Sequence, residues 1–213
     1  NQASVDSQGR SACYLMEDRF PGWLTTLFSP QHGFAGKQQA NMIETRDSYH
    51  VELGLPVYSL YSHTRRPTRQ MLQDIDFLVV DLQDVGTRVY TYIWTLSYCL
   101  EACQESGLPV VILDRVNPIG GVQVEGPCLD PDYTSFVGRA PIPMRHALTI
   151  GEMACWLNQS MEINAELEVI PVRGWERQEL FGETGLPWVA PSPNLPGWEN
   201  CLVYPGQVIL ETT

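Results

Sequence analysis

The chain has 213 residues, of which 44% are hydrophobic, so it is long enough to bury a sizeable core. Its 25 acidic and 13 basic side chains give a formal net charge of −12, and no basic run offsets the excess. Such a chain repels nucleic acid and anionic membrane surfaces, which excludes a phosphate-backbone partner as its main ligand. No apolar run approaches the length of a membrane span.

Short apolar runs bounded by Pro, Gly or Asp recur along the chain and predict five β-strands. In chain order they lie at residues 25–29, 56–61, 76–82, 109–114 and 167–172. Two of them contain the continuously apolar runs "FLVV" and "VVIL", which are typical of parallel strands covered on both faces.

Helical patterns alternate with these strands. They predict helices at residues 10–18, 67–73, 90–106 and 149–159, and the last begins with Thr149 and Glu152 in capping-box spacing. Alternation of strands and helices predicts an α/β fold with a doubly wound, mostly parallel sheet and helices on both faces. The start, "NQASVDSQGRSACYLM", resembles the middle of a domain, so we expect a first strand to precede it.

The longest stretch between predicted elements, residues 115–148, contains Pro and Gly throughout. It is too long for an ordinary connection, which favours a functional role.

Ligands of an open parallel sheet bind beyond the carboxyl ends of its strands. Polar residues directly follow every predicted strand, at positions 29–32, 59–63, 81–88, 114–117 and 173–174. Gathered at one edge, they would form a cleft that contains carboxylates, arginines and a histidine.

Each of these features also has a purely structural interpretation. His32 in "PQHG" could close a turn, and Asp81 and Asp114 could cap the helices that follow them. The run "DLQDVGTR" has more polar groups than a cap requires, which favours a binding role. In "LDRVNPIGG", three polar residues suit the hydroxyls of a sugar or a carboxylate, although an internal Asp-Arg pair is the alternative.

We expect no metal, nucleotide or other cofactor. No G-x-G-x-x-G segment opens a helix, and no P-loop pattern occurs. The four histidines lack the i, i+4 spacing of a helical zinc pair, and no C-x-x-C pair joins them.

A series of long motifs then resembles one family. In order they are "LFSPQHGFAG", "GLPVYSLYS", "RRPT", "DLQDVGTRVYTYI", "LDRVNPIGG", "VEGP", "SFVGRAPIPMRHALTIGE" and "PWVAPSPNLP". They are similar to those of the NamZ-type exo-β-N-acetylmuramidases, from the first residue to the last. The resemblance implies that residues 1–213 are a Rossmann-like catalytic N-terminal domain, without its first strand and without a smaller C-terminal domain.

The implied reaction is hydrolysis of the β-glycosidic bond that releases N-acetylmuramic acid from the non-reducing end of peptidoglycan fragments. The partners would be peptidoglycan-derived saccharides, with neither nucleic acid nor a membrane span. A peptidoglycan substrate favours a periplasmic or secreted protein, with fragment recycling in the cytoplasm as the alternative.

The candidate site residues come from these motifs and from the segment "NMIETRD" at residues 41–47. We predict catalytic roles for His32, Glu44 and Asp84. Substrate-binding candidates are Gln31, Arg88, Tyr90, Asp114, Arg115, Asn117, Glu125, His146 and Asn194. Of the two nearby arginines, Arg88 is preferred over Arg115 to hold the lactyl carboxylate of the muramyl ring.

One position departs from the family pattern. Members typically have Ser-Pro-Glu-His-Gly where this chain has Ser29-Pro30-Gln31-His32-Gly33, and an amide cannot donate the catalytic proton. Either another acid such as Glu44 or Asp84 takes that role, or the protein binds a muramyl sugar without cleaving it efficiently. A third possibility, from another class, is an interaction or scaffold protein that uses the acidic surface. The hydrolase is favoured because a set of polar residues keeps the family pattern and would have little purpose in an empty cleft: Asp84, Arg88, Asp114, Arg115 and Glu125.

Overall fold

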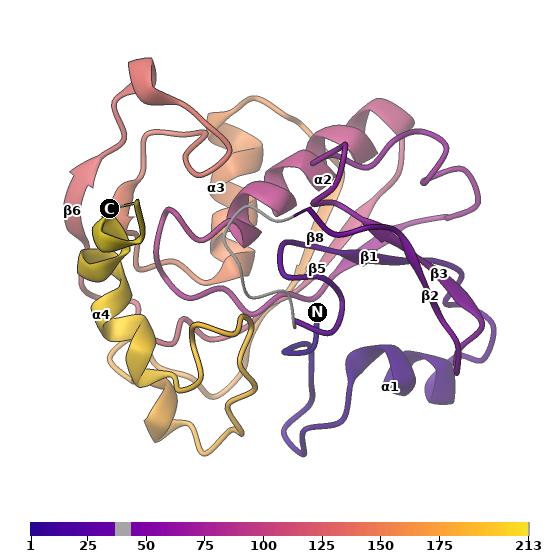
Figure 1. The fold of residues 1–213 in the computed structure, drawn as a ribbon, viewed down its shortest axis with the longest axis horizontal. Coiled ribbons are helices and arrows are strands. Elements are labelled where there is room, and N and C mark those ends of the chain that lie inside the picture. Colours follow the sequence, from indigo (N-terminus) through magenta and orange to yellow (C-terminus); the bar gives the residue numbers. More distant parts are fainter. Residues whose placement is uncertain (37–43, 213) are drawn as a thin grey trace.

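Six of the described strands form two separate three-stranded sheets in the computed structural model, which describes residues 1–36 and 44–212. The first has the order β1 (Leu27–Ser29), β3 (Leu55–Ser59), β2 (Ser48–His50), with β1 parallel and β2 antiparallel to β3. The second has the order β4 (Leu78–Val80), β5 (Val110–Leu113), β8 (Leu167–Ile170), and all its strands are parallel. Figure 1 shows how the elements are arranged.

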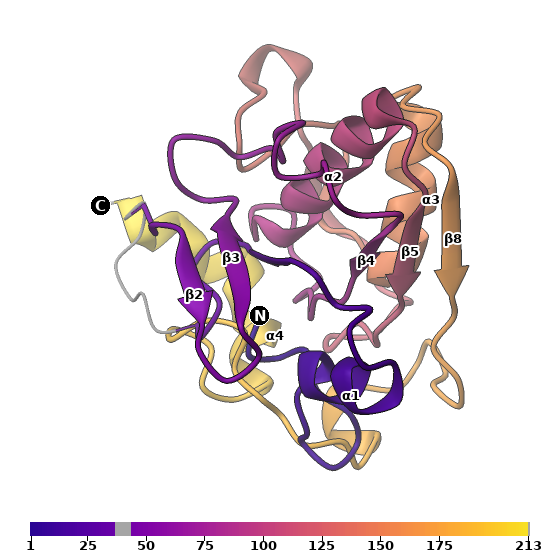
Figure 2. The ribbon, with the colours of Figure 1, turned by 90° about the vertical axis from the view of Figure 1, so that its right-hand side faces the viewer.

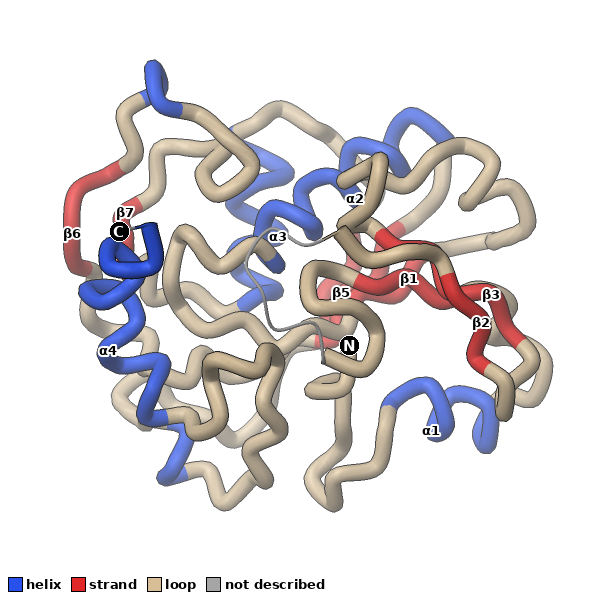
Figure 3. The backbone as a smooth tube through the Cα atoms, in the orientation of Figure 1, coloured by secondary structure: helices blue, strands red, loops and turns tan. Residues whose placement is uncertain are grey.

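A third, two-stranded antiparallel sheet joins β6 (Glu125–Cys128) to β7 (Pro143–Arg145). It lies within the long stretch of residues 115–148, at the side of the molecule away from β2 and β3 (Figure 3). The sequence did not indicate these strands, because β6 is exposed along its length and lacks an apolar alternation.

Helices α2 (Tyr92–Ser106) and α3 (Ile150–Ser160) pack against each other, and α3 also contacts β5 and β8. Helix α1 (Ala12–Arg19) lies on the other side of these strands in Figure 1. Helix α4 (Glu199–Gln207) and three 3₁₀ helices, η1 (Pro131–Tyr133), η2 (Phe181–Glu183) and η3 (Val208–Thr212), complete the described elements. None of the described helices combines the length and apolarity needed to cross a membrane.

The core forms between the β4-β5-β8 sheet and α2. Val110 and Ile112 of β5 are fully buried, as are Leu96 and Leu100 of α2, and all four belong to one cluster. Burial of each such side chain contributes about 1.5–3 kcal/mol. Most residues of α2 are buried, because strands cover one face of the helix and α3 covers another (Figure 2).

The predicted fold class, α/β with mostly parallel strands, is confirmed, and all five predicted strands are present with shorter bounds. Three predicted helices are present as α1, α2 and α3. Helix α2 ends where Gly107 adopts a left-handed conformation (φ 67°), and the capping box joins Thr149 to Glu152 in both directions.

The helix predicted at residues 67–73 is wrong. The segment forms turns in which Leu72 N–H donates to the Thr68 carbonyl at 3.2 Å, and no regular helix follows. The Thr68 hydroxyl accepts from Met71 N–H at 3.3 Å, which is the contact of a helix N-cap, but the turn that it begins is not extended into a helix. A single turn has the entropic cost of helix nucleation without the gain from propagation.

The capping box of α3 gives a direct test of the fold. We expect Thr149→Ala to lower the free energy of unfolding by about 1 kcal/mol, because the Glu152 N–H loses its side-chain acceptor. The exposed Thr134→Ala is the matched control and should change the free energy by less than about 0.5 kcal/mol. Chemical denaturation of the two variants checks this, and equal effects would contradict the assigned cap.

Candidate functional site

The loop after β1 carries a strained turn at its centre. His32 adopts φ 71° and Gly33 φ 77°, and Gly33 N–H donates to the Pro30 carbonyl at 3.1 Å. A left-handed conformation is uncommon for a residue other than glycine, and such strain is found most often at functional loops. His32 itself is buried, so it lies inside the loop and not on the molecular surface.

Gln31 is held by the start of α2. Its side-chain oxygen accepts a 2.7 Å hydrogen bond from the hydroxyl of Thr91, the residue that precedes the helix. The side chain of Gln31 is half-buried. The β1 loop is thereby joined to the N-terminal end of α2.

The hydroxyl of Tyr92 joins segments that are far apart in the sequence. It accepts a 2.7 Å hydrogen bond from Asn1 Nδ2 and donates to the Pro191 carbonyl at 2.8 Å. The Gln31 carbonyl is 3.5 Å away. Asn1 and Tyr92 are both buried, so these bonds form away from water. They join Asn1, the start of α2 and Pro191.

Tyr90 packs beside this group. Its ring centroid is 4.7 Å from that of Tyr92. Burial raises the pKa of both phenols, and the negative charge of Asp84 raises them further. The two phenols therefore stay protonated and can donate hydrogen bonds.

Asp84 and His146 form a buried pair. His146 Nε2 lies 3.3 Å from Asp84 Oδ2, and the side chains are 1% and 5% exposed respectively. His146 Nδ1 accepts from Leu148 N–H at 3.2 Å, so in a neutral ring the proton is on Nε2 and faces the carboxylate. Gly86 N–H donates to the same carboxylate oxygen at 2.8 Å. The other oxygen, Oδ1, is buried with no hydrogen-bond partner in the described chain, and His146 Nε2 likewise makes no hydrogen bond there despite its 3.3 Å approach.

The two arginines expected in the cleft have protein partners. Arg88 Nη1 donates to the carbonyls of Pro127 and Ile142 at 2.8 and 2.7 Å, and burial lowers the pKa of Arg88. Arg115 forms an ion pair with Asp81 through two nitrogens, one at 2.9 Å, and donates to the Val5 carbonyl at 3.0 Å. A sugar carboxylate would have to displace Asp81 to pair with Arg115, whereas Arg88 Nε is buried without a hydrogen-bond partner in the described chain.

Asp114 and Asn117 brace the loop after β5. Asp114 Oδ1 accepts from Gly151 N–H at 2.7 Å, at the start of α3. Asn117 donates to the Leu148 carbonyl at 3.0 Å and accepts from Ile119 N–H at 3.1 Å. Asp114 also lines a cavity of about 460 Å³ with Asp81 and Arg115, a group separate from Gln31 and Tyr92.

The remaining candidates lie at the surface. Glu44 is 61% exposed and 3.7 Å from Arg65, and Glu125 is 64% exposed and paired with Arg145 at 2.7 Å. Asn194 is exposed. Residues 41–43 of the segment that contains Glu44 lie outside the described residues. No group of three or more potential metal ligands occurs in the part of the chain that the structure describes.

The structure thus places a subset of the predicted residues in two buried groups, Gln31 with Tyr90 and Asp84 with His146. It adds Asn1, Thr91 and Tyr92, which sequence reasoning missed. Thr91 and Tyr92 lie inside the motif "DLQDVGTRVYTYI" and could have been found there. Asn1 carries no comparable signal, because its role depends on a contact across 91 positions of the sequence.

Comparison with known proteins gives consistent matches. The family model described as "Exo-beta-N-acetylmuramidase NamZ, N-terminal" matches residues 1–199. A similar curated protein is the peptidoglycan β-N-acetylmuramidase NamZ of Bacillus subtilis (strain 168), 45% identical over 213 residues. That alignment covers all of this chain and 51% of the relative.

Two crystal structures of DUF1343 family proteins from Bacteroides fragilis NCTC 9343 have the same fold. One is 38% identical to this chain with a TM-score of 0.90, and the match covers 99% of this chain and 53% of the Bacteroides chain. The other is 33% identical with a TM-score of 0.81, and the match covers 100% of this chain and 55% of the other chain. The chain therefore spans about half the length of the relatives that it matches.

The position of Arg88 generates a test. We expect Arg88→Lys to lower the free energy of unfolding by about 1–3 kcal/mol, because an ammonium group cannot reach both carbonyls and leaves a buried acceptor unpaired. Arg10→Lys, at an exposed ion pair with Asp6, is the control and should be nearly neutral. Thermal and chemical denaturation measure both; a stable Arg88→Lys variant would show that this guanidinium is not a structural brace.

Proposed function

Because the chain belongs to the family described as the N-terminal part of the exo-β-N-acetylmuramidase NamZ, we propose that the protein it forms part of is a glycoside hydrolase. Its substrate is a peptidoglycan fragment, and its product is N-acetylmuramic acid released from the non-reducing end. Since peptidoglycan lies outside the cytoplasmic membrane, the proposed site of action is the periplasm or the cell exterior.

One observation carries the mechanistic part of this proposal. Asp84 is a buried carboxylate with one oxygen held and the other, Oδ1, without a hydrogen-bond partner among the described residues. An unpaired buried carboxylate oxygen costs free energy, and such costs are retained mainly where a ligand or a reaction uses the group. Of the three predicted catalytic residues, Asp84 therefore has the best support.

The chemistry of glycoside hydrolysis explains what Asp84 can do. The transition state carries positive charge on the sugar ring, and one carboxylate acts beside it as nucleophile or base. In this arrangement Asp84 Oδ1 faces the reacting carbon or its attacking water. His146 is assigned a positioning role, because its buried ring lies against the other carboxylate oxygen, with Nε2 3.3 Å from it.

The second carboxyl group, the general acid, is not supplied by the β1 loop. Gln31 occupies the position where the family typically has Glu, and its side-chain oxygen is held by Thr91. Glu44 is exposed, whereas glycosidase acids are usually surrounded by apolar groups that favour the protonated form. The relatives extend to about twice the length of this chain, and we place the acid in that remainder.

Gln31 also supports a second candidate function, a protein that binds a muramyl sugar and cleaves it poorly or not at all. An amide in place of the acid preserves hydrogen bonding and removes proton transfer. The two functions differ in turnover and not in sugar affinity.

The role of Asp84 is tested with the native-length protein. We expect Asp84→Asn to reduce turnover of a chromogenic β-N-acetylmuramide by about 10²- to 10⁴-fold, since the amide can act neither as nucleophile nor as base. Asp132→Asn, at an exposed position, is the control and should retain full turnover. Steady-state kinetics measure both variants. Full activity of Asp84→Asn, with its fold intact by circular dichroism, would remove Asp84 from the mechanism.

The acid is tested in the same assay with Gln31→Glu and Glu44→Gln. We expect Gln31→Glu to have turnover equal to or above that of the parent. Glu44→Gln should not show the fall of about 10²-fold or more that loss of a general acid produces. An inactive parent that binds N-acetylmuramic acid, together with an active Gln31→Glu variant, would establish the sugar-binding function instead.

A further inference from the structure

An anionic sugar needs a positive partner on a chain whose formal net charge is −12. N-acetylmuramic acid differs from N-acetylglucosamine by a lactyl group that carries a carboxylate. Acidic surroundings repel this group, so specificity for it requires a cation at the site itself. Of the arginines expected to serve, Arg88 is buried with Nη1 held by two carbonyls, and Arg115 pairs with Asp81.

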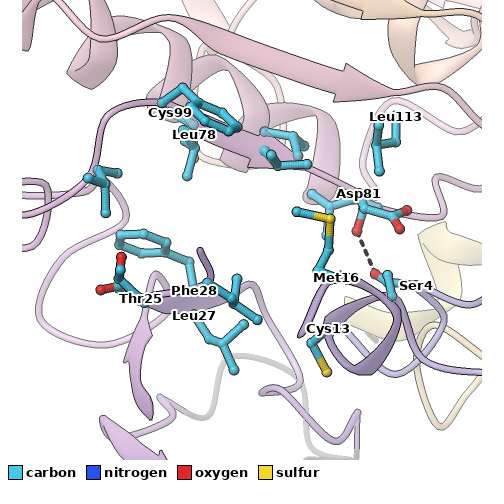
Figure 4. Close-up of a pocket in the computed structure, with 18 of the residues that line it drawn as sticks. Ser4, Cys13, Met16, Thr25, Leu27, Phe28, Leu78, Asp81, Cys99 and Leu113 are labelled. Atoms are coloured by element: carbon cyan, nitrogen blue, oxygen red, sulfur yellow. Dashed lines mark hydrogen bonds between the residues drawn. The ribbon is translucent and has the colours of Figure 1, made fainter. Parts of the chain in front are cut away.

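The apolar cavity between the β1-β3-β2 and β4-β5-β8 sheets does not supply that cation. It measures about 460 Å³, and Figure 4 shows Phe28 and Leu78 on opposite sides of it. Its described lining contains no lysine or arginine but includes the carboxylates of Asp74 and Asp76. The separate cavity beside Arg115 contains the carboxylate that neutralises this arginine. Neither cavity suits an anion.

Another arginine, Arg65, lies on the loop that follows β3. Ser29 of β1 pairs in register with Ser59 of β3, and Leu60 N–H donates to the Ser29 carbonyl at 2.8 Å. Because β1 and β3 are parallel, the loops that follow them leave the same edge of the sheet. The loop of Arg65 therefore begins beside the loop that carries Gln31.

Two aromatic rings hold the guanidinium of Arg65. Its central carbon lies 3.9 Å from the centroid of the Tyr61 ring and 5.4 Å from that of Phe136. The centroids of these rings are 5.7 Å apart. Arg65 Nη1 also donates to the Ser62 carbonyl. A guanidinium stacked on an aromatic face keeps its remaining edge available for hydrogen bonds in its own plane.

That remaining edge of Arg65 has no close partner among the described residues. Nε and Nη2 make no hydrogen bond there, and the ion pair with Glu44 spans 3.7 Å from Nη2. The Arg65 side chain is 25% exposed and that of Glu44 is 61% exposed, so solvent reaches the pair. Exposed ion pairs are weak, so another carboxylate can replace Glu44 at small cost.

This loose pairing sets Arg65 apart from the other half-buried arginines of the described chain. Arg66, Arg139 and Arg145 each lie 2.6–2.7 Å from a glutamate oxygen, and Arg115 lies 2.9 Å from Asp81. Arg65 alone in this group lacks a carboxylate within hydrogen-bond distance. It is therefore the arginine whose charge is most available to a ligand.

We propose that Arg65 determines the specificity of the site for an anionic sugar, by pairing through Nε and Nη2 with the lactyl carboxylate of N-acetylmuramic acid in place of Glu44. This assignment rests on the proposed function, because the sugar must occupy the site beside Gln31. Two parallel N–H···O bonds fix the carboxylate in the plane of the guanidinium. Glu44 is then the counter-ion of Arg65 when no sugar is bound. A sugar without the lactyl group makes no such contact.

Sugar binding by the native-length protein tests the assignment, measured by titration calorimetry with N-acetylmuramic acid and with N-acetylglucosamine. We expect the parent to prefer N-acetylmuramic acid. Arg65→Lys should lose at least about tenfold of that preference, because an ammonium group lacks the fork geometry. Its affinity for N-acetylglucosamine should be unchanged. Arg66→Lys, next in the chain and paired with Glu105, is the matched control and should keep the preference.

Glu44→Gln tests the same contact in the opposite direction and leaves the aromatic contacts of Arg65 in place. Removal of the competing carboxylate should tighten binding of N-acetylmuramic acid by up to about fivefold. Binding of N-acetylglucosamine should not change, because that sugar does not compete with Glu44.

The outcomes separate this assignment from the hydrolase. A preference in Arg65→Lys equal to that of the parent, or a parent that binds both sugars equally, would overturn the role of Arg65. If Arg65→Lys does not fold, unchanged or weaker binding of N-acetylmuramic acid by Glu44→Gln would overturn it as well. A preference that depends on Arg65, in a protein that hydrolyses no β-N-acetylmuramide, would support the assignment and contradict the hydrolase.

Discussion

The burial of the Asp84 carboxylate is the constraint on which the candidate site depends. A carboxylate removed from water costs several kcal/mol unless donors replace its hydration. Here Gly86 N–H and the facing nitrogen of His146 approach one oxygen only. The loop after β4 must therefore be held rigidly, since any shift would expose or misalign the remaining oxygen.

The long segment between β5 and α3 supplies that rigidity. His146 belongs to it and donates its backbone N–H to the Gly86 carbonyl at 3.3 Å. Arg88 N–H donates to Met144, and the Arg88 guanidinium holds Pro127 and Ile142. A stretch with little regular structure is thus fastened to the loop that carries Asp84. Its length, which predicted a functional role, is explained by the need to bring His146 back to β4.

The parts of the fold that depend on local pattern could be predicted from the sequence. Apolar runs gave the five strands, and Thr149 with Glu152 marked the start of α3. The directions of side chains could not be predicted in this way. Arg88 and Arg115 lie beyond strand ends as expected, but two backbone carbonyls occupy Nη1 of Arg88 and Asp81 pairs with Arg115. Asn1 was missed because its partner Tyr92 is distant in sequence. The helix prediction for residues 67–73 failed because the single turn that begins at Thr68 does not propagate.

The account joins a strained loop at His32, an amide at Gln31 and a carboxylate at Asp84 into one sugar site. A crystal structure of the native-length protein with N-acetylmuramic acid bound tests this most directly. The account predicts the anomeric carbon about 3–3.5 Å from Asp84 Oδ1, in the near-attack range. A sugar bound instead in the separate cavity beside Arg115, with Asp84 out of reach, would contradict it.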